Sequence, residues 1–179
     1  MPHPTRYGFW LRNLHWLIAA MVICALTLVE LHDLAPRGSA LRSNMMYGHM
    51  QFGMAVLLLF LPRLIVRLVG KRPSVVPPEP WWMSLPAKAV HVIFYGLMVV
   101  QPVLGILMMQ AGDHQLAFLG IPLPTLVAPD KALNRTLHDI HEICGTIFLW
   151  LAILHAAAAF WHHWGRKDNT LRRMLYLRS

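Results

Sequence analysis

Apolar residues gather in four long stretches of the chain, and polar residues, glycines and prolines gather between them. The stretches run over residues of about 14–31, 47–69, 88–110 and 138–164, and Pro62 and Arg63 interrupt the second of them. About 20 apolar residues suffice for a helix to cross the hydrocarbon core of a bilayer, so each stretch predicts one membrane-spanning helix. We therefore predict an all-α fold, a transmembrane four-helix bundle that forms a single membrane domain over residues 1–179.

The segments between the apolar stretches have the composition of loops. Residues 32–46, 70–87 and 111–137 are rich in proline, glycine and polar residues. The middle segment holds five prolines, too many for a helix interior. After Gly165 the chain is polar and basic, which predicts a tail outside the membrane.

Composition agrees with an environment of lipid. The chain is 56% hydrophobic and 13% charged, whereas about 25% charged residues is usual in soluble domains. Basic residues outnumber acidic ones by 16 to 8, but no basic stripe alternates with exposed aromatic residues. Membrane lipid is therefore the expected contact, and nucleic acid is excluded as a partner. Tryptophans flank the predicted spans as in the aromatic belt of a membrane interface; they are Trp10, Trp16, Trp81, Trp82, Trp161 and Trp164.

Lysine and arginine are distributed unequally between the two sides of the predicted bundle. Twelve lie in the terminal segments and around the connection between the second and third spans, against four in the other two connections. Positive residues concentrate in cytoplasmic segments, so both termini are expected in the cytoplasm. The twelve are Arg6, Arg12, Arg63, Arg67, Lys71, Arg72, Lys88, Arg166, Lys167, Arg172, Arg173 and Arg178.

Eleven histidines are many for so apolar a chain, and polar side chains within a membrane are functional candidates. His141 and His155 lie 14 residues apart on the fourth span. This is just under four helical turns, so both side chains point to nearly the same face, about 21 Å apart along the axis. One histidine is therefore expected near each membrane surface.

Each of these two histidines has a candidate partner at its own depth. His15 opens the first span and is level with His155, whereas His49 opens the second span and is level with His141. Two imidazoles suit a haem iron, because the porphyrin supplies the other four nitrogens, whereas a closed zinc site needs four protein ligands. We predict two haem b groups stacked across the membrane, with His15, His49, His141 and His155 as the metal ligands.

Other interpretations of these histidines stay open. His138 lies one turn before His141 and is an alternative ligand, and His91, which opens the third span, is a weaker one. Copper is a less favoured metal. Covalent haem attachment is excluded, because neither Cys24 nor Cys144 lies in a Cys-x-x-Cys-His sequence.

Small and basic residues near the histidines favour the haem interpretation without proving it. Gly53 and Gly145 each lie four residues after a predicted ligand, on the same helix face. They predict either room for a flat macrocycle or close packing of helices. Arg63 and Arg67, also four apart, are candidates for binding the propionates of the haem on the cytoplasmic side or for contacting lipid headgroups. His162 and His163 are either interfacial residues or hydrogen-bond partners of a quinone headgroup.

The chain resembles the bacterial cytochrome b561 family over nearly its whole length. The polyalanine stretch that follows His155 and the Lys-Asp-Asn-Thr-Leu sequence of the tail are the most specific of the matching stretches. These stretches are Leu14-His15-Trp16, Gly48-His49 with Gly53, Arg63-Leu64 with Arg67-Leu68, Pro102-Val103 with Gly105, His141-Glu142, Leu154-His155-Ala156-Ala157-Ala158-Ala159, His162-His163 and Lys167-Asp168-Asn169-Thr170-Leu171.

The resemblance implies the same four ligands and a specific activity. It implies a multi-pass protein of the bacterial inner membrane that oxidises superoxide to dioxygen at the periplasmic side and passes the electrons to ubiquinone. His162 and Lys167 match positions that we associate with the quinone. No obligate protein partner is expected. The alternative is a haem b electron-carrier subunit of a larger membrane dehydrogenase or hydrogenase-type complex.

Overall fold

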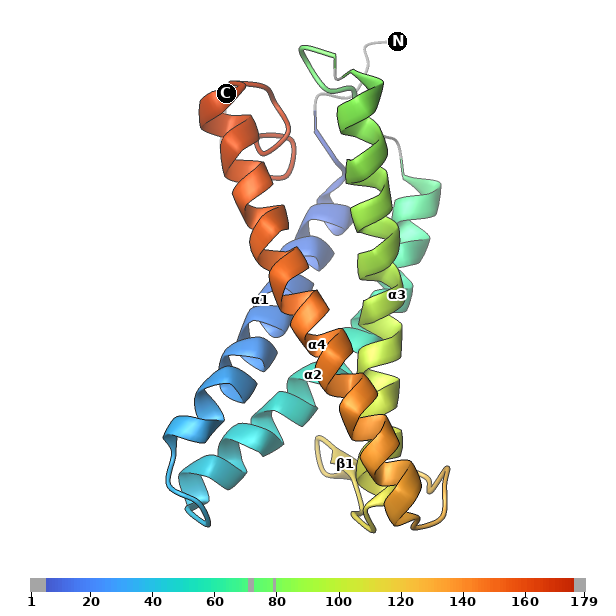
Figure 1. The fold of residues 1–179 in the computed structure, drawn as a ribbon. Coiled ribbons are helices and arrows are strands. Elements are labelled where there is room, and N and C mark those ends of the chain that lie inside the picture. Colours follow the sequence, from blue (N-terminus) through green and yellow to red (C-terminus); the bar gives the residue numbers. More distant parts are fainter. Residues whose placement is uncertain (1–5, 71–72, 79, 176–179) are drawn as a thin grey trace.

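Four long helices make up most of the computed structural model, which describes residues 6–70, 73–78 and 80–175 (Figure 1). They are α1 (Phe9–Leu31), α2 (Ala40–Val69), α3 (Trp81–Ala111) and α4 (Lys131–Phe160). A short 3₁₀ turn (His32–Leu34) follows α1, and one π-helical turn (Trp161–Gly165) follows α4. All four helices are long and apolar enough to cross a membrane. The predicted all-α transmembrane four-helix bundle is thus confirmed.

The helices are longer than the apolar stretches that predict them. Residues 40–46 and 131–137, which we predicted to be loops, are helical. Both helices begin at a capping side chain: Ser39 accepts a hydrogen bond from the backbone of Arg42, and Asp130 accepts two from the first turn of α4. Capping satisfies the free N–H groups at a helix start, so a helix can extend beyond the apolar part of its sequence.

Prolines do not end the helices where the sequence suggested. Pro62 lies inside α2, and Pro86 lies inside α3, so the prediction of a loop over residues 81–87 was wrong. Each proline removes only one backbone hydrogen bond, and a long membrane helix with intact turns on both sides tolerates that loss. Among the residues used for the orientation, Lys71, Arg72 and Arg178 lie outside the described residues.

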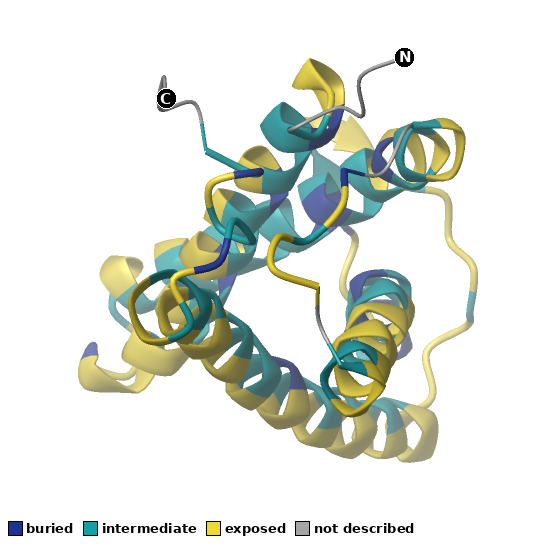
Figure 2. Cartoon of the chain, turned by 90° about the horizontal axis from the view of Figure 1, so that it is seen from above, coloured by how far each residue is buried: buried dark blue, intermediate teal, exposed yellow. Residues whose placement is uncertain are grey.

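The helices form two antiparallel hairpins, α1 with α2 and α3 with α4, and in Figure 1 α1 and α4 cross near mid-height. All four helices contribute to the core at this level, which is formed by Ile18, Val56, Leu97, Met98 and Phe148. Viewed from above, the outward faces of the helices are mostly exposed (Figure 2), as is expected of surfaces that contact lipid. The core therefore separates the two ends of the bundle.

We name the two ends of the bundle the terminal end and the loop end, according to the segments found there. The terminal end holds Tyr7, the connection between α2 and α3, and the tail after Gly165. The loop end holds the connections 32–39 and 112–130. At the loop end a small hairpin of β1 (Ala117–Phe118) and β2 (Ile121–Pro122) is fastened to α2, because Gln51 donates to Ala117 O at 2.7 Å and accepts from Leu119 N at 3.0 Å.

The tail folds back over the terminal end. The backbone N–H of Tyr7 donates to Arg173 O at 3.3 Å. Trp16 Nε1 donates to Met174 O at 2.9 Å, and Arg173 Nη1 donates to Pro73 O at 2.7 Å. The tail thus connects the start of α1 with the segment between α2 and α3.

Candidate functional site

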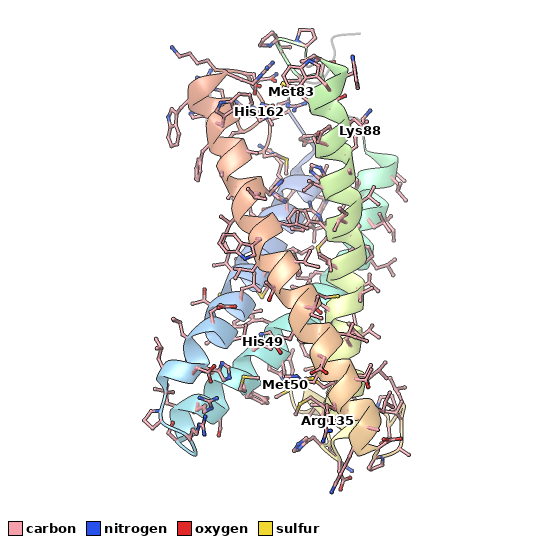
Figure 3. All side chains as sticks on the ribbon, in the orientation of Figure 1. His49, Met50, Met83, Lys88, Arg135 and His162 are labelled. Carbon is pink, nitrogen blue, oxygen red and sulfur yellow. The ribbon has the colours of Figure 1, made fainter. Side chains whose placement is uncertain are left out.

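His49 on α2 and His141 on α4 face each other near the loop end, and we call them the loop-end pair. Their ring centroids are 6.2 Å apart and the rings are nearly perpendicular, at 86°. His49 Nδ1 lies 2.9 Å from Ala25 O, so Nδ1 donates to this carbonyl and Nε2 is available to a ligand. Figure 3 labels His49 on the α2 segment. In His141 the buried Nδ1 has no hydrogen-bond partner.

His15 on α1 and His155 on α4 form an equivalent terminal-end pair. Their ring centroids are 6.3 Å apart, and the angle between the rings is 82°. His91 and Phe94, both on α3, contact the His155 ring edge to face at centroid distances of 5.5 and 5.4 Å. The two pairs thus lie on opposite sides of the bundle core, and α4 contributes one histidine to each.

The spacing within each pair fits two imidazoles on a single metal ion. An imidazole nitrogen binds a transition metal at about 2.0–2.1 Å. Its ring centre lies roughly 1 Å further away, so two ligands on opposite sides of one metal have centroids about 6 Å apart. Each pair supplies two nitrogens, and no group of three or more His, Cys, Asp and Glu in the described part of the chain is placed to hold a metal. The donor set fits a haem, in which a porphyrin completes the coordination.

The alternative ligand His138 lies elsewhere. Its ring is exposed, with Nδ1 3.8 Å from a carboxylate oxygen of Asp139 and 4.0 Å from one of Glu142. His141, rather than His138, faces His49. The structure therefore favours His141 as the ligand at the loop end.

Glycines surround the loop-end pair in different ways. A Cβ atom at Gly53 would meet nothing within 4 Å, so this glycine leaves open space beside α2. A Cβ atom at Gly145 would lie 3.0 Å from Gln101 Nε2, which donates to His141 O at 3.1 Å. Gly53 thus agrees with room for a macrocycle, whereas Gly145 agrees with close helix packing. Gly105 on α3 was missed as a site residue: a Cβ atom there would lie 3.3 Å from Cε1 of His141.

We expect Gly105→Val to weaken cofactor binding at the loop-end pair. The added side chain would press against His141 and turn its ring, and changes to residues that orient a metal ligand typically cost about 10–100-fold in affinity. Gly96→Val on the same helix is the matched control, because Gly96 is exposed and a Cβ atom there meets nothing within 4 Å. Haem titration monitored by absorbance measures the effect. Equal titrations for both variants would contradict a role of Gly105 in holding His141.

Arg63 is a buried cation beside the terminal-end pair. It is nine-tenths buried, interacts electrostatically with His15 and His155, and leaves Nε and Nη1 without hydrogen-bond partners. Arg67 lies one turn further along α2, and its Nη1 is likewise buried and without a partner. Within residues 6–70, 73–78 and 80–175, neither arginine forms an ion pair with a carboxylate. Both arginines therefore fit a role in binding an anion that belongs to a cofactor.

The quinone candidates His162 and Lys167 are not placed together as one site. His162 Nδ1 donates to Asp168 Oδ2 at 2.6 Å, and Arg166 Nε donates to the same oxygen at 3.3 Å. Lys167 is exposed and has a positive φ of 54°. Figure 3 labels His162 and Met83, both at the terminal end, and Arg166 Nη1 lies 3.1 Å from Met83 Sδ.

Asp168 organises this region and was missed by the sequence interpretation, although it lies in the Lys-Asp-Asn-Thr-Leu stretch. Its side chain is fully buried. Burial opposes ionisation, but the hydrogen bonds from His162 and Thr170 outweigh it and hold the pKa of the Asp168 carboxyl below its ordinary value. The carboxylate thus fixes His162 and Arg166 at the end of α4.

Comparison with known proteins gives one consistent result. A family model described as prokaryotic cytochrome b561 matches residues 6–176. Cytochrome b561 homolog 1 of Escherichia coli (strain K12) is 34% identical over 162 residues, which cover 90% of this chain and 92% of that protein. The probable superoxide oxidase CybB of Yersinia pestis is 34% identical over 165 residues, covering 91% and 92%. Cytochrome b561 homolog 2 of Escherichia coli (strain K12) is 25% identical over 180 residues, covering 96% and 92%.

Proposed function

This chain belongs to the prokaryotic cytochrome b561 family, and we propose that within this family of haem b membrane redox proteins it is a superoxide:ubiquinone oxidoreductase with two haem b groups. The two histidine pairs carry the proposal, because each pair has a spacing that fits two imidazoles on one metal ion and the pairs lie at opposite ends of the bundle. The similarity to a probable superoxide oxidase supports the choice of reaction.

In this proposal the chain positions the two haem groups and determines the charges and hydrogen bonds around them. Haem b, when bound, supplies the one-electron redox change. His49 and His141 hold one group near the loop end, and His15 and His155 hold the other near the terminal end. The Ala25 carbonyl fixes the ring of His49 through Nδ1, and Arg63 places a positive charge beside the terminal-end pair.

The stoichiometry follows from the two substrates. Superoxide loses one electron and leaves as dioxygen, whereas ubiquinone takes up two electrons and two protons to become ubiquinol. Two superoxide ions are therefore consumed for each ubiquinone.

The loop end carries more acidic than basic residues, because Glu30, Asp33, Asp113, Asp130, Asp139 and Glu142 outnumber Arg37, Arg42, Lys131 and Arg135, so the proposed attraction of superoxide rests on local positive charge. Arg42 is neutralised by Asp33, with Nη2 2.5 Å from Oδ1. Lys131 and Arg135, in the first turns of α4, are exposed and form no ion pair within the described ranges. Figure 3 labels Arg135 at the loop end. Local positive charge raises the encounter rate of an anion. We propose that the loop end faces the periplasm and the terminal end the cytoplasm of a bacterial inner membrane, in agreement with the distribution of lysine and arginine.

Ubiquinone is assigned to the terminal end in this proposal. His162 lies in the π-helical turn that follows α4 and is held by Asp168 through Nδ1; in this proposal its imidazole contacts the quinone. Lys167 is exposed at the same end of the bundle and provides a cation there.

The proposal is tested with purified holoprotein, a superoxide source and a water-soluble ubiquinone analogue. We expect quinone reduction at least about tenfold faster than in a haem-free control, a change of about 1.4 kcal/mol in activation free energy. Superoxide dismutase should abolish it, because it removes the electron donor. A rate equal to that of the control would contradict the proposal and favour the alternative, a haem b electron-carrier subunit of a larger dehydrogenase or hydrogenase-type complex.

A further inference from the structure

Two arginines from distant parts of the sequence flank one tyrosine at the terminal end. The Cζ atom of Arg67, near the end of α2, lies 5.7 Å from the ring centroid of Tyr7, and the Cζ atom of Arg173, in the tail, lies 5.6 Å from the same centroid. The Tyr7 backbone also donates to Arg173 O. Two positive charges are thus held beside one aromatic ring by three segments of the chain.

Among residues 6–70, 73–78 and 80–175, each of these two guanidinium groups has one buried nitrogen without a hydrogen-bond partner. Arg173 is only 6% exposed, and its Nη1 donates to Pro73 O, but its buried Nε has no partner. Arg67 Nη1 is also buried and has no partner. The acid of the tail, Asp168, is already engaged by His162 and Arg166. Within the described ranges no carboxylate pairs with either arginine, and an unpaired buried cation is costly, so the arrangement calls for an anion.

The position of this cluster relative to the terminal-end pair indicates which anion fits. Arg63 lies beside His15 and His155, and Arg67 follows it by four residues on the same face of α2. Arg63 thus places a positive charge beside the proposed haem, and Arg67 places a second one beside Tyr7 and Arg173. A haem propionate is a carboxylate on a short flexible chain at the edge of the porphyrin, so it suits positive charges in this position. Arginine binds carboxylates through paired N–H groups.

We propose that Arg67 and Arg173, on either side of Tyr7, bind one propionate of the haem held by His15 and His155. This inference rests on the proposed function, because it requires a haem at the terminal-end pair. In this proposal the tail, whose sequence indicates only a basic segment outside the membrane, forms part of the cofactor site. The phosphate of an anionic lipid has similar chemistry and is the other source to be distinguished.

The test compares the full-length protein reconstituted with protohaem IX and with its dimethyl ester, which lacks both carboxylates. Haem loss to excess apomyoglobin is followed by absorbance, in neutral detergent with and without phosphatidylglycerol. Arg173→Gln and Arg67→Gln are compared with Arg172→Gln, whose side chain is exposed in the tail beside Arg173. Far-ultraviolet circular dichroism checks that each variant folds.

We expect Arg173→Gln to accelerate the loss of one of the two protohaem groups by about tenfold, as for the loss of one hydrogen bond to a charged group. Arg67→Gln should act in the same direction, and Arg172→Gln should match the wild type. With the dimethyl ester, the difference between Arg173→Gln and the wild type should disappear.

Three results would overturn the inference. One is an unchanged rate in Arg173→Gln, and another is equal acceleration for protohaem and its ester, which would indicate a general loosening of the tail. The third is a wild-type rate that depends on phosphatidylglycerol but not on the propionates, which would assign the site to a lipid phosphate. These readouts do not involve superoxide or quinone, so failure of the proposed reaction is distinguishable from failure of this inference.

Discussion

His141→Ala is expected to halve the haem content of the purified protein, from two groups per chain to one. The substitution removes one of two facing imidazoles at the loop end and leaves the terminal-end pair untouched, beyond the core of the bundle. With one imidazole left, the haem would keep only one of its two proposed protein ligands, so we expect it to be bound too weakly to survive purification. Pyridine haemochrome absorbance per protein measures the content, and the spectrum of the reduced protein identifies the group that remains.

The other histidines provide matched comparisons for this result. His49→Ala should leave the same spectrum as His141→Ala, whereas His15→Ala and His155→Ala should leave the complementary one. His138→Ala is the control, because its ring is exposed and faces Asp139 and Glu142. If His138→Ala removes a haem and His141→Ala does not, the assignment at the loop end is wrong. Loss of both groups in a single variant would contradict two independent sites.

Asp168→Ala is expected to release the tail from the terminal end. Its fully buried carboxylate accepts from His162 Nδ1, Arg166 Nε and the backbone of Thr170. Removing one partner of a buried ion pair typically costs about 3–5 kcal/mol. Hydrogen–deuterium exchange over residues 166–175 should therefore rise sharply, while the cores of the four helices stay protected. Asp168→Asn, which keeps the shape but not the charge, should give an intermediate effect.

The same carboxylate gives the tail a defined pH dependence. The pKa of Asp168 is lower in the folded protein than in the unfolded chain, so its stabilising contribution is complete above the ordinary carboxyl pKa of about 3.9. The contribution is lost as the pH falls through the lowered value. Exchange in the tail, corrected for the intrinsic rate, should rise below about pH 4 in the wild type and show no such step in Asp168→Ala. A step common to both proteins would assign it to another group.

The histidine pairs could be predicted because they depend on helix geometry alone. Fourteen residues between His141 and His155 place both on one face of α4, and the alternation of spans fixes which end His15 and His49 occupy. The structure brings these four side chains together in the predicted pairs; their role as haem ligands stays a prediction.

The helix ends and the tail were harder to predict, for different physical reasons. Hydropathy reports contact with lipid, whereas helices α2 and α4 begin where Ser39 and Asp130 cap them. Arg173 is buried through backbone carbonyls and the Tyr7 ring, partners that no sequence pattern marks. The position of Asp168 depends on a turn with positive φ at Lys167, a conformation that the sequence does not indicate for a lysine.

The placement of both α4 histidines on one continuous helix limits how the length of this chain can change. Inserting a single residue between His141 and His155 would rotate one ring relative to the other by about 100° and shift it by about 1.5 Å, so one of the two pairs would separate. An insertion in the connection between α3 and α4 leaves that spacing unchanged. Among natural variants of this protein, gaps and insertions should therefore accumulate in residues 112–130 and be absent from residues 142–154.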